Sequence, residues 1–242
     1  MINKKKILCI IPARSGSKRI KNKNLLKLTN HTLVELAFKV AKKSKICDYI
    51  FVNTDKPKIA RKLPYIKRPK KLSGPKVDIS DVIYDSLIKL EKNLKTKFDY
   101  VICLQPTSPL RNSRLITSLM RNVINKKANG GITGVKIVPW NWKIKNEHGY
   151  NAWYPKKYPR SQEFEKITFW QEINTVQIAS RHAVLKKKRW GLPLYVQLIP
   201  SYASIDIDEK KDFKKTKKIY SQLIKLLNNE KFIEGNLINK IN

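Results

Sequence analysis

"IPARSGSKRIKNKNL", residues 11–25, places five cations on a segment that directly follows an apolar run. The preceding stretch "KILCIIPA" (6–13) predicts a short buried strand, and "TLVELAFKVAKKS" (32–44) has the apolar spacing of an amphipathic helix. The cationic stretch therefore connects a strand to a helix. In α/β proteins, ligands bind at the edge of the sheet where such connections lie.

The same alternation of apolar runs and helical patterns continues along the chain and predicts βα units around a largely parallel sheet flanked by helices. This alternation of strand and helix patterns extends to the final helix, which is expected near the carboxyl terminus. Further strands are expected at 49–55, 99–104, 131–138, 173–180 and 194–200, and further helices at 78–94, 113–127 and 212–227.

Residues 139–170 interrupt this alternation, because they are rich in Trp, Tyr and Pro and lack a clear periodicity. We interpret them as an inserted arm of a single domain that spans residues 1–242. No run approaches the roughly 18 apolar residues of a membrane-spanning helix. The apolar run at the start is short and interrupted by Pro12, so a core strand is favoured over a signal peptide. These features predict a soluble, cytoplasmic protein.

Charge is the unusual feature of the composition, since 52 Lys and Arg residues face 18 Asp and Glu residues, a formal net charge of +34. Such an excess favours anionic partners, namely nucleic acid, acidic membranes or phosphorylated small molecules. Compositional drift toward lysine explains it equally well, because the lysines are scattered over every segment.

The cations of residues 11–25 have two interpretations. They clamp a triphosphate, whose charges need close and fixed partners, or they form a solvated basic loop. Neither of the familiar phosphate-binding glycine patterns is present in this segment. Phosphate binding is the favoured interpretation because of the position between strand and helix.

Near the carboxyl terminus, "SIDID" (204–208) sets Asp206 and Asp208 two residues apart. On a strand end, this spacing points both carboxylates to one face. An isolated acidic pair in so basic a chain indicates a Mg²⁺ site. The alternative is that Asp208 caps the helix that begins near Glu209.

Three motifs in order resemble those of the CMP-sugar synthetases, the family of acylneuraminate cytidylyltransferase (CMP-sialic acid synthetase) and CMP-Kdo synthetase. They are residues 11–25, "LQPTSPLR" (104–111) and "SIDIDEKKDF" (204–213), with "VNTD" (52–55) and "RPKKL" (68–72) between them. The resemblance spans nearly the whole chain. It implies a Rossmann-like nucleotidyltransferase fold and the transfer of CMP from CTP to a nonulosonic sugar acid, for surface glycans such as lipopolysaccharide.

The resemblance also implies roles for individual residues. Those for the nucleotide are Arg14 and Lys18 on the triphosphate, Lys23 on the phosphate under attack, Asn24 and Arg68 on cytidine, and Gln105 at the junction of nucleotide and sugar. Asp206 and Asp208 would hold Mg²⁺. Arg160, with Lys143, would bind the sugar carboxylate, whereas Arg19 and Lys21 are expected to be surface residues.

The chain departs from the family on the sugar side, where the family carries Asn-Gly-Ala-Ile-Tyr and this chain has "NTVQI" (174–178). Asn174 is kept, and Gln177 brings an amide to the sugar-binding wall. A bulkier wall at Thr175 and this amide would suit a nonulosonic acid of the legionaminic or pseudaminic type.

The resemblance further implies that the arm at 139–170 builds a homodimer, with Trp140, Trp142, Trp153 and Trp170 mostly packed. Base stacking on these tryptophans is the alternative, but nucleic acid is not the expected partner. The competing hypothesis for the whole chain is a non-catalytic protein that binds nucleic acid or anionic surfaces through its positive charge.

Overall fold

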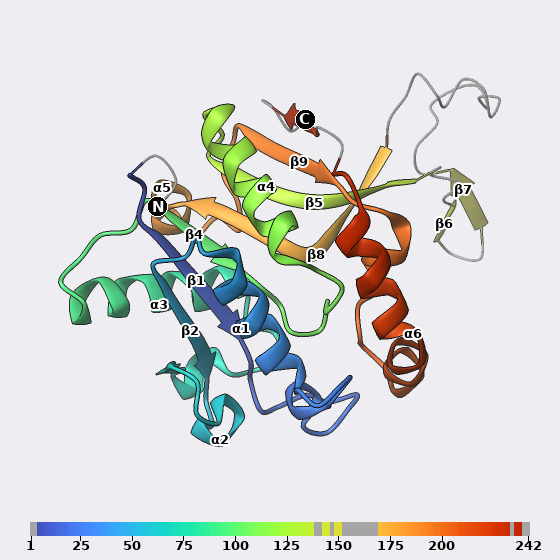
Figure 1. Cartoon of the computed structure of the whole chain (residues 1–242), viewed down its shortest axis with the longest axis horizontal. Coiled ribbons are helices and arrows are strands. Elements are labelled where there is room, and N and C mark those ends of the chain that lie inside the picture. The colour runs from blue at the N-terminus through green and yellow to red at the C-terminus, as the bar shows by residue number, and fades with distance from the viewer. Residues whose placement is uncertain (1–3, 138–141, 146–147, 152–168, 233–234, 239–242) are drawn as a thin grey trace.

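The structure, a computed structural model, describes residues 4–137, 142–145, 148–151, 169–232 and 235–238. One mixed sheet runs through it in the order β10-β9-β5-β8-β4-β1-β2-β3 (Figure 1). Its strands are β1 (Ile7–Pro12), β2 (Tyr49–Thr54), β3 (Tyr65–Lys67), β4 (Tyr100–Cys103), β5 (Gly130–Ile137), β8 (Phe169–Ser180), β9 (Leu194–Leu198) and β10 (Asn236–Ile238).

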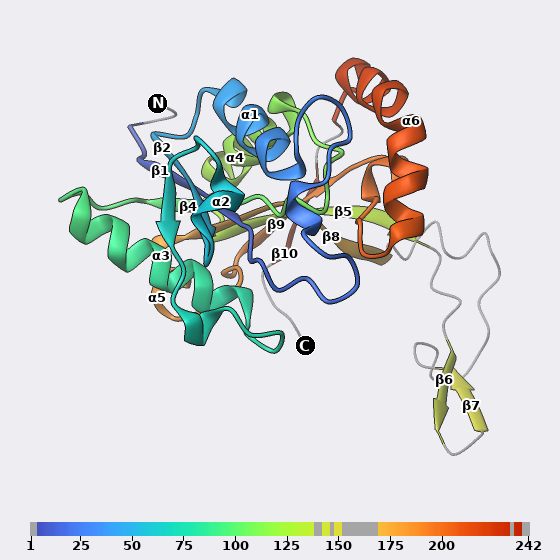
Figure 2. The same ribbon diagram turned by 90° about the horizontal axis from the view of Figure 1, so that it is seen from below.

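The helices divide between the two faces of this sheet. They are α1 (Leu33–Ser44), α2 (Pro57–Ala60), α3 (Ile79–Asn93), α4 (Ser113–Asn125), α5 (Arg181–Leu185) and α6 (Lys210–Asn229), with 3₁₀ turns η1 (Lys23–Leu25), η2 (Lys70–Leu72) and η4 (Ser201–Ser204). In Figure 2, α1, α4 and α6 lie on one side of the sheet and α3 and α5 on the other.

The alternation of side chains along β1 explains why both faces are covered. Ile7, Cys9 and Ile11 pack in the core cluster that contains α1 and α4, whereas Leu8 and Ile10 pack in the cluster that contains α3 and α5. All five are fully buried. A strand buried on both faces reads as a continuous apolar run, which is the pattern in residues 7–11.

The α/β prediction is confirmed, and the sheet is more mixed than expected. β1 pairs in parallel with β2 and β4, and β3 and β9 also have parallel neighbours. β8, in contrast, runs antiparallel to both β4 and β5, and β10 runs antiparallel to β9. β8 therefore brings its amino-terminal residues to the edge at which β1, β2 and β4 end.

One local prediction is wrong. Residues 205–208 do not end a strand, because they form an extended segment between η4 and α6. Asp208 is also not the N-cap of α6, a position that Glu209 takes.

The arm lies largely outside the described residues. Within it, β6 (Trp142–Lys145) pairs antiparallel with β7 (His148–Asn151), and Lys143 stands opposite Tyr150. Arg160, Trp140 and Trp153 are outside the described part of the chain. No helix in the described part is long and apolar enough to cross a membrane.

Candidate functional site

A cleft of about 460 Å³ opens at the edge where β1 and β4 end. Four chain segments form it: the loop after β1, the segment from β3 to α3, the loop after β4 and the segment after η4. All eight residues that the sequence assigned to the nucleotide and the metal line it, namely Arg14, Lys18, Lys23, Asn24, Arg68, Gln105, Asp206 and Asp208.

Hydrogen bonds fix the loop after β1. The Ser15 backbone N–H donates to Asp55 Oδ1 at 2.7 Å, and the Ser15 hydroxyl donates to the other carboxylate oxygen. Asn24 Nδ2 donates to the carbonyl of Arg14 at 2.9 Å, so the two ends of the loop are tied together. Asn22 adopts a left-handed conformation, which asparagine tolerates better than most residues.

The carboxylate of Asp55 anchors the loop after β1, and the hydrogen bonds from Ser15 change its pKa. Burial raises it, but the hydrogen bonds from Ser15 outweigh burial and leave the pKa below its ordinary value. Asp55 is therefore ionised across the neutral range and holds the loop as an anion. Asp55 was not identified from the sequence, although it ends the quoted "VNTD" stretch directly after β2.

Asp208 lies at the centre of the cationic side of the cleft. Its Oδ1 atom is 3.0 Å from Lys23 Nζ and 2.9 Å from Arg19 Nη2. Lys23 is mostly buried, with 14% of its side chain exposed, whereas 61% of the Arg19 side chain is exposed. Arg19 is thus at the surface, as expected, but it also lines the cleft.

Asp206 brings an unpaired carboxylate oxygen to the cleft. Its Oδ1 atom is buried and has no hydrogen-bond partner among the described residues. An unpaired buried carboxylate oxygen is costly, and a cation satisfies it. No group of three or more His, Cys, Asp or Glu side chains gathers in the described residues. Two carboxylates in the cleft lining, Asp206 and Asp208, fit Mg²⁺, which takes one or two carboxylates and completes its coordination with water and phosphate oxygens.

Arg68 is held from the end of β2. Its Nε atom donates to Asn53 Oδ1 and its Nη2 atom to the carbonyl of Asn53, while Asn53 Nδ2 donates to Ser86 Oγ at 2.7 Å. Burial lowers the pKa of Arg68 to about 10, against the opposing effect of the Asp55 carboxylate. Asn53 was not identified from the sequence, and it fixes the direction in which Arg68 enters the cleft.

Arg111 supports the loop that carries Gln105. Its Nη2 atom donates to the carbonyls of Gln105 and Ser108, which closes the loop after β4 from beneath. Only 1% of Arg111 is exposed, and burial lowers its pKa to about 10. Arg111 is the last residue of the "LQPTSPLR" motif, and no role was predicted for it from the sequence.

The predicted sugar-side residues Asn174 and Gln177 lie on β8, outside the lining of the cleft. β5 pairs Ile132 with Gln177 and then Thr133 with Ile173, so residues 174–176 form a bulge. The Thr133 hydroxyl donates to the carbonyl of Ile173 at 2.7 Å and accepts from the Val176 N–H at 3.4 Å, which pins this bulge. Such bulges re-aim side chains beside functional sites.

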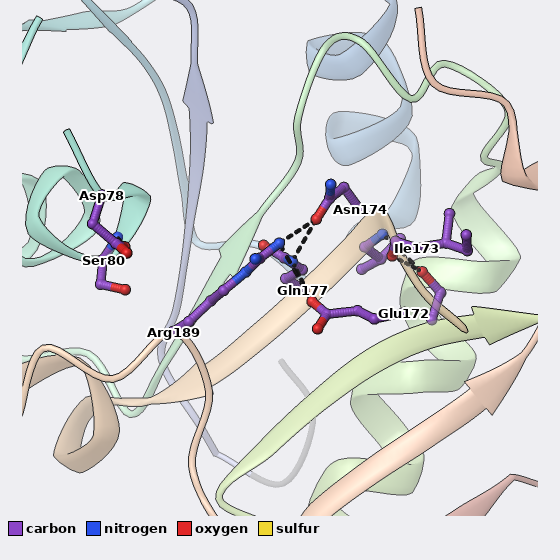
Figure 3. Close-up of polar contacts among 9 residues, drawn as sticks. Asp78, Ser80, Glu172, Ile173, Asn174, Gln177 and Arg189 are labelled. Atoms are coloured by element: carbon purple, nitrogen blue, oxygen red, sulfur yellow. Dashed lines mark hydrogen bonds and ion pairs between the residues drawn. The ribbon is translucent and has the colours of Figure 1, made fainter. Parts of the chain in front are cut away.

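Thr175 was expected from the sequence to make the sugar-binding wall bulkier, but its side chain does not face a ligand-accessible surface. It is fully buried, and its hydroxyl has no hydrogen-bond partner within the described part of the chain. A further residue takes part instead. Arg189, between α5 and β9, donates to Asn174 Oδ1, and Figure 3 shows it extended toward Asn174 and Gln177. We name Glu172, Asn174, Gln177 and Arg189 the β8 wall.

Comparisons with known proteins match most of the chain. A family model described as Cytidylyltransferase matches residues 8–232. The CMP-N,N'-diacetyllegionaminic acid synthase of Legionella pneumophila is 27% identical over 225 residues, which cover 88% of this chain and 96% of that protein. The post-translational flagellin modification protein B of Campylobacter coli is 33% identical over 135 residues, covering 53% of this chain but only 57% of that protein.

Among solved structures, a CMP:2-keto-3-deoxy-manno-octonic acid synthetase complexed with CTP matches with a TM-score of 0.65. The match covers 90% of this chain and 99% of that chain at 17% sequence identity. At this identity the likeness concerns the fold, and it confirms the expected Rossmann-like nucleotidyltransferase architecture.

Proposed function

We propose that this chain, which belongs to the cytidylyltransferase family, transfers CMP from CTP to the anomeric hydroxyl of a nonulosonic acid. Membership in the family makes it a CTP-dependent nucleotidyltransferase of the CMP-sugar synthetase type. The nature of the acceptor is the proposal. It is supported by the printed activity of the Legionella pneumophila relative, which aligns over 96% of its length.

One observation carries the reaction: the cleft gathers cations, two side-chain amides and two carboxylates from segments of the chain up to 194 residues apart, the distance from Arg14 to Asp208. The acceptor oxygen would form a bond to the α-phosphorus as the bond to pyrophosphate breaks. Arg14 and Lys18 would hold the phosphates of the leaving group, and Lys23 would offset charge at the phosphate under attack. Arg68 and Asn24 would contact cytidine, and Gln105 the junction of the two substrates.

Asp206 and Asp208 would hold the divalent cation. When bound, Mg²⁺ neutralises phosphate oxygens and orients the triphosphate. Asp208 is also paired with Lys23 and Arg19. The chain's own part is to keep two carboxylates at the cleft, one of them with a buried oxygen free to coordinate.

Purified protein with CTP, Mg²⁺ and a panel of nonulosonic acids plus Kdo tests the proposal by pyrophosphate release. We expect release with at least one nonulosonic acid, none when ATP replaces CTP, and loss of activity with a chelator. CTP binding without release on the whole panel would contradict the acceptor class. Absence of CTP binding would favour the competing hypothesis, a non-catalytic protein that binds nucleic acid or anionic surfaces.

The remaining expectations stay proposals of the same kind. We expect one catalytic domain over residues 1–242, with the 139–170 arm reaching a second subunit, where Arg160 and Lys143 would meet the sugar carboxylate. Light scattering of the full chain should give twice the monomer mass of 28.2 kDa. A monomer with full activity would contradict the role of the arm. The product would serve surface glycans, made in the cytoplasm where CTP is supplied.

A further inference from the structure

Two side chains of the β8 wall, Gln177 and Arg189, share the same two oxygen atoms of the other two, Glu172 and Asn174. Gln177 Nε2 donates to Glu172 Oε1 and to Asn174 Oδ1, each at 2.9 Å. The guanidinium of Arg189 donates to the same Asn174 oxygen and lies 3.3 Å from the same Glu172 oxygen. Glu172 Oε1 and Asn174 Oδ1 are therefore each shared by Gln177 and Arg189 (Figure 3).

The ionic members of this network fix the orientation of both amides. An arginine side chain only donates hydrogen bonds, and an ionised glutamate only accepts them. Asn174 must therefore turn its oxygen toward Arg189, and Gln177 must turn its nitrogen toward Glu172. In a network of amides alone, both side chains would be free to flip.

This arrangement leaves one donor and one acceptor for a ligand. With Asn174 Oδ1 engaged, its Nδ2 atom points away from the network, as Figure 3 shows. With Gln177 Nε2 engaged, its carbonyl oxygen is the remaining polar atom. Gln177 is only 2% exposed and lines a narrow recess between β8 and the start of α3, together with Ser80 and Arg189.

The charge of the network selects a neutral group. Glu172 balances Arg189, and its carboxylate would repel an anion that approached the same guanidinium. A donor and an acceptor whose orientations are both fixed match a substituent that carries both a carbonyl and an N–H, which is an acylamino group. Cys103 on β4 is the pairing partner of Gln177 on β8. Gln105 follows Cys103 by two residues, so the β8 wall lies at the same edge of the sheet as Gln105.

We propose that Arg189 and Glu172 set the acceptor specificity by locking Asn174 and Gln177 in the orientation that binds an acylamino substituent. The inference rests on the nonulosonic acceptor proposed above. Arg189 acts through the two amides, so it is a positioning residue, and Asn174 and Gln177 make the contact.

The test compares two acceptors that differ only in an acylamino or a hydroxyl group at one carbon. In Arg189→Met, we expect the KM for the acylamino acceptor to rise about tenfold, because a change of this size corresponds to the loss of one or two hydrogen bonds. The KM for the hydroxyl acceptor, the KM for CTP and kcat should stay within about twofold. Arg189→Lys keeps a side chain that only donates, so it should retain most of the preference. Lys186→Met, an exposed position just after α5, is the matched control.

Glu172→Gln gives a second, independent variant, because the new amide can both donate and accept. It should reduce the preference as Arg189→Met does, and the double variant should lose little more than either single one. The side-chain amide signals of Asn174 and Gln177 in ¹⁵N NMR spectra, identified by Asn174→Asp and Gln177→Glu, should shift and exchange faster in Arg189→Met.

The outcomes separate this inference from the proposed function. Transfer to both acceptors without preference, or a preference that survives in Arg189→Met, would overturn the inference and leave the function standing. Unchanged amide signals in Arg189→Met would do the same. No transfer to either acceptor, with CTP bound, would overturn the proposed function and the inference together.

Discussion

The two sides of the site are built in different ways. The cationic side (Arg14, Lys18 and Lys23) lies on one loop of ten residues, and its anchors, Asp55 and Asp208, lie in the short motifs "VNTD" and "SIDID". The β8 wall instead joins three residues of a bulged strand to Arg189, from another segment. A short motif therefore specifies the first side, whereas tertiary pairing specifies the second.

This difference has a chemical reason. A triphosphate needs several cations at close range, and one loop after a strand supplies them together. A neutral substituent needs a donor and an acceptor with fixed orientation, and fixing them takes partners from neighbouring elements. Substitutions on the cationic side should therefore affect turnover or CTP, and substitutions on the β8 wall should affect the acceptor.

The largest effect is expected for Asp208→Asn. This change removes a carboxylate that pairs with Lys23 and Arg19 and that would hold Mg²⁺. We expect kcat for pyrophosphate release to fall about 10²–10³-fold, with the melting temperature nearly unchanged because 42% of the side chain is exposed. Glu209→Gln, at the next and exposed carboxylate, is the matched control. Near-normal turnover in Asp208→Asn would remove it from the metal site.

Lys23→Ala should come next, with kcat lowered about 10²-fold and the KM for CTP changed less. The reason is that Lys23 is mostly buried beside Asp208, where its charge is poorly screened by water. Lys21→Ala removes an exposed lysine from the same loop and should have little effect. If both variants kept the same kcat, the loop would bind CTP without contributing to the chemical step.

The comparison also explains what could be predicted from the sequence. The order of elements and the cleft residues were predictable because strand and helix periods are local, and each site residue follows a predicted strand or lies in a motif. Gln105 and Asp206 line the same cleft although 101 positions separate them, because their segments both reach one edge of the sheet.

Three features could not be predicted from local pattern. The antiparallel direction of β8 depends on a long connection through the arm, so its apolar period gives no direction. The bulge at 174–176 depends on the hydroxyl of Thr133, which lies on another strand. Arg189 sits in "LKKKRWG", where nothing distinguishes it from the neighbouring surface lysines.

Asp55→Asn tests whether the cationic side depends on its anchor. The amide accepts fewer hydrogen bonds from Ser15, so the loop should loosen and the KM for CTP should rise about tenfold. Because the pKa of Asp55 lies below its ordinary value, the anchor is complete above about pH 4 and is lost only as pH falls through that lowered pKa. The CTP KM of the wild type should thus stay flat from neutral to weakly acidic pH. Acceptor discrimination that changed along with the CTP KM would break the separation between the two sides.

The smallest effect is expected for Thr133→Val, which removes the hydroxyl that pins the bulge but keeps the shape of the side chain. The loss of one buried hydrogen bond should reduce the free energy of unfolding by about 1 kcal/mol. Since Asn174 lies on this bulge, the acceptor KM should rise about fivefold, following the same 1 kcal/mol scale, while the KM for CTP stays constant. Chemical denaturation and steady-state kinetics on the same preparation measure both. An increase in the CTP KM instead would mean that the bulge supports the cationic side, and the two sides would then be one unit.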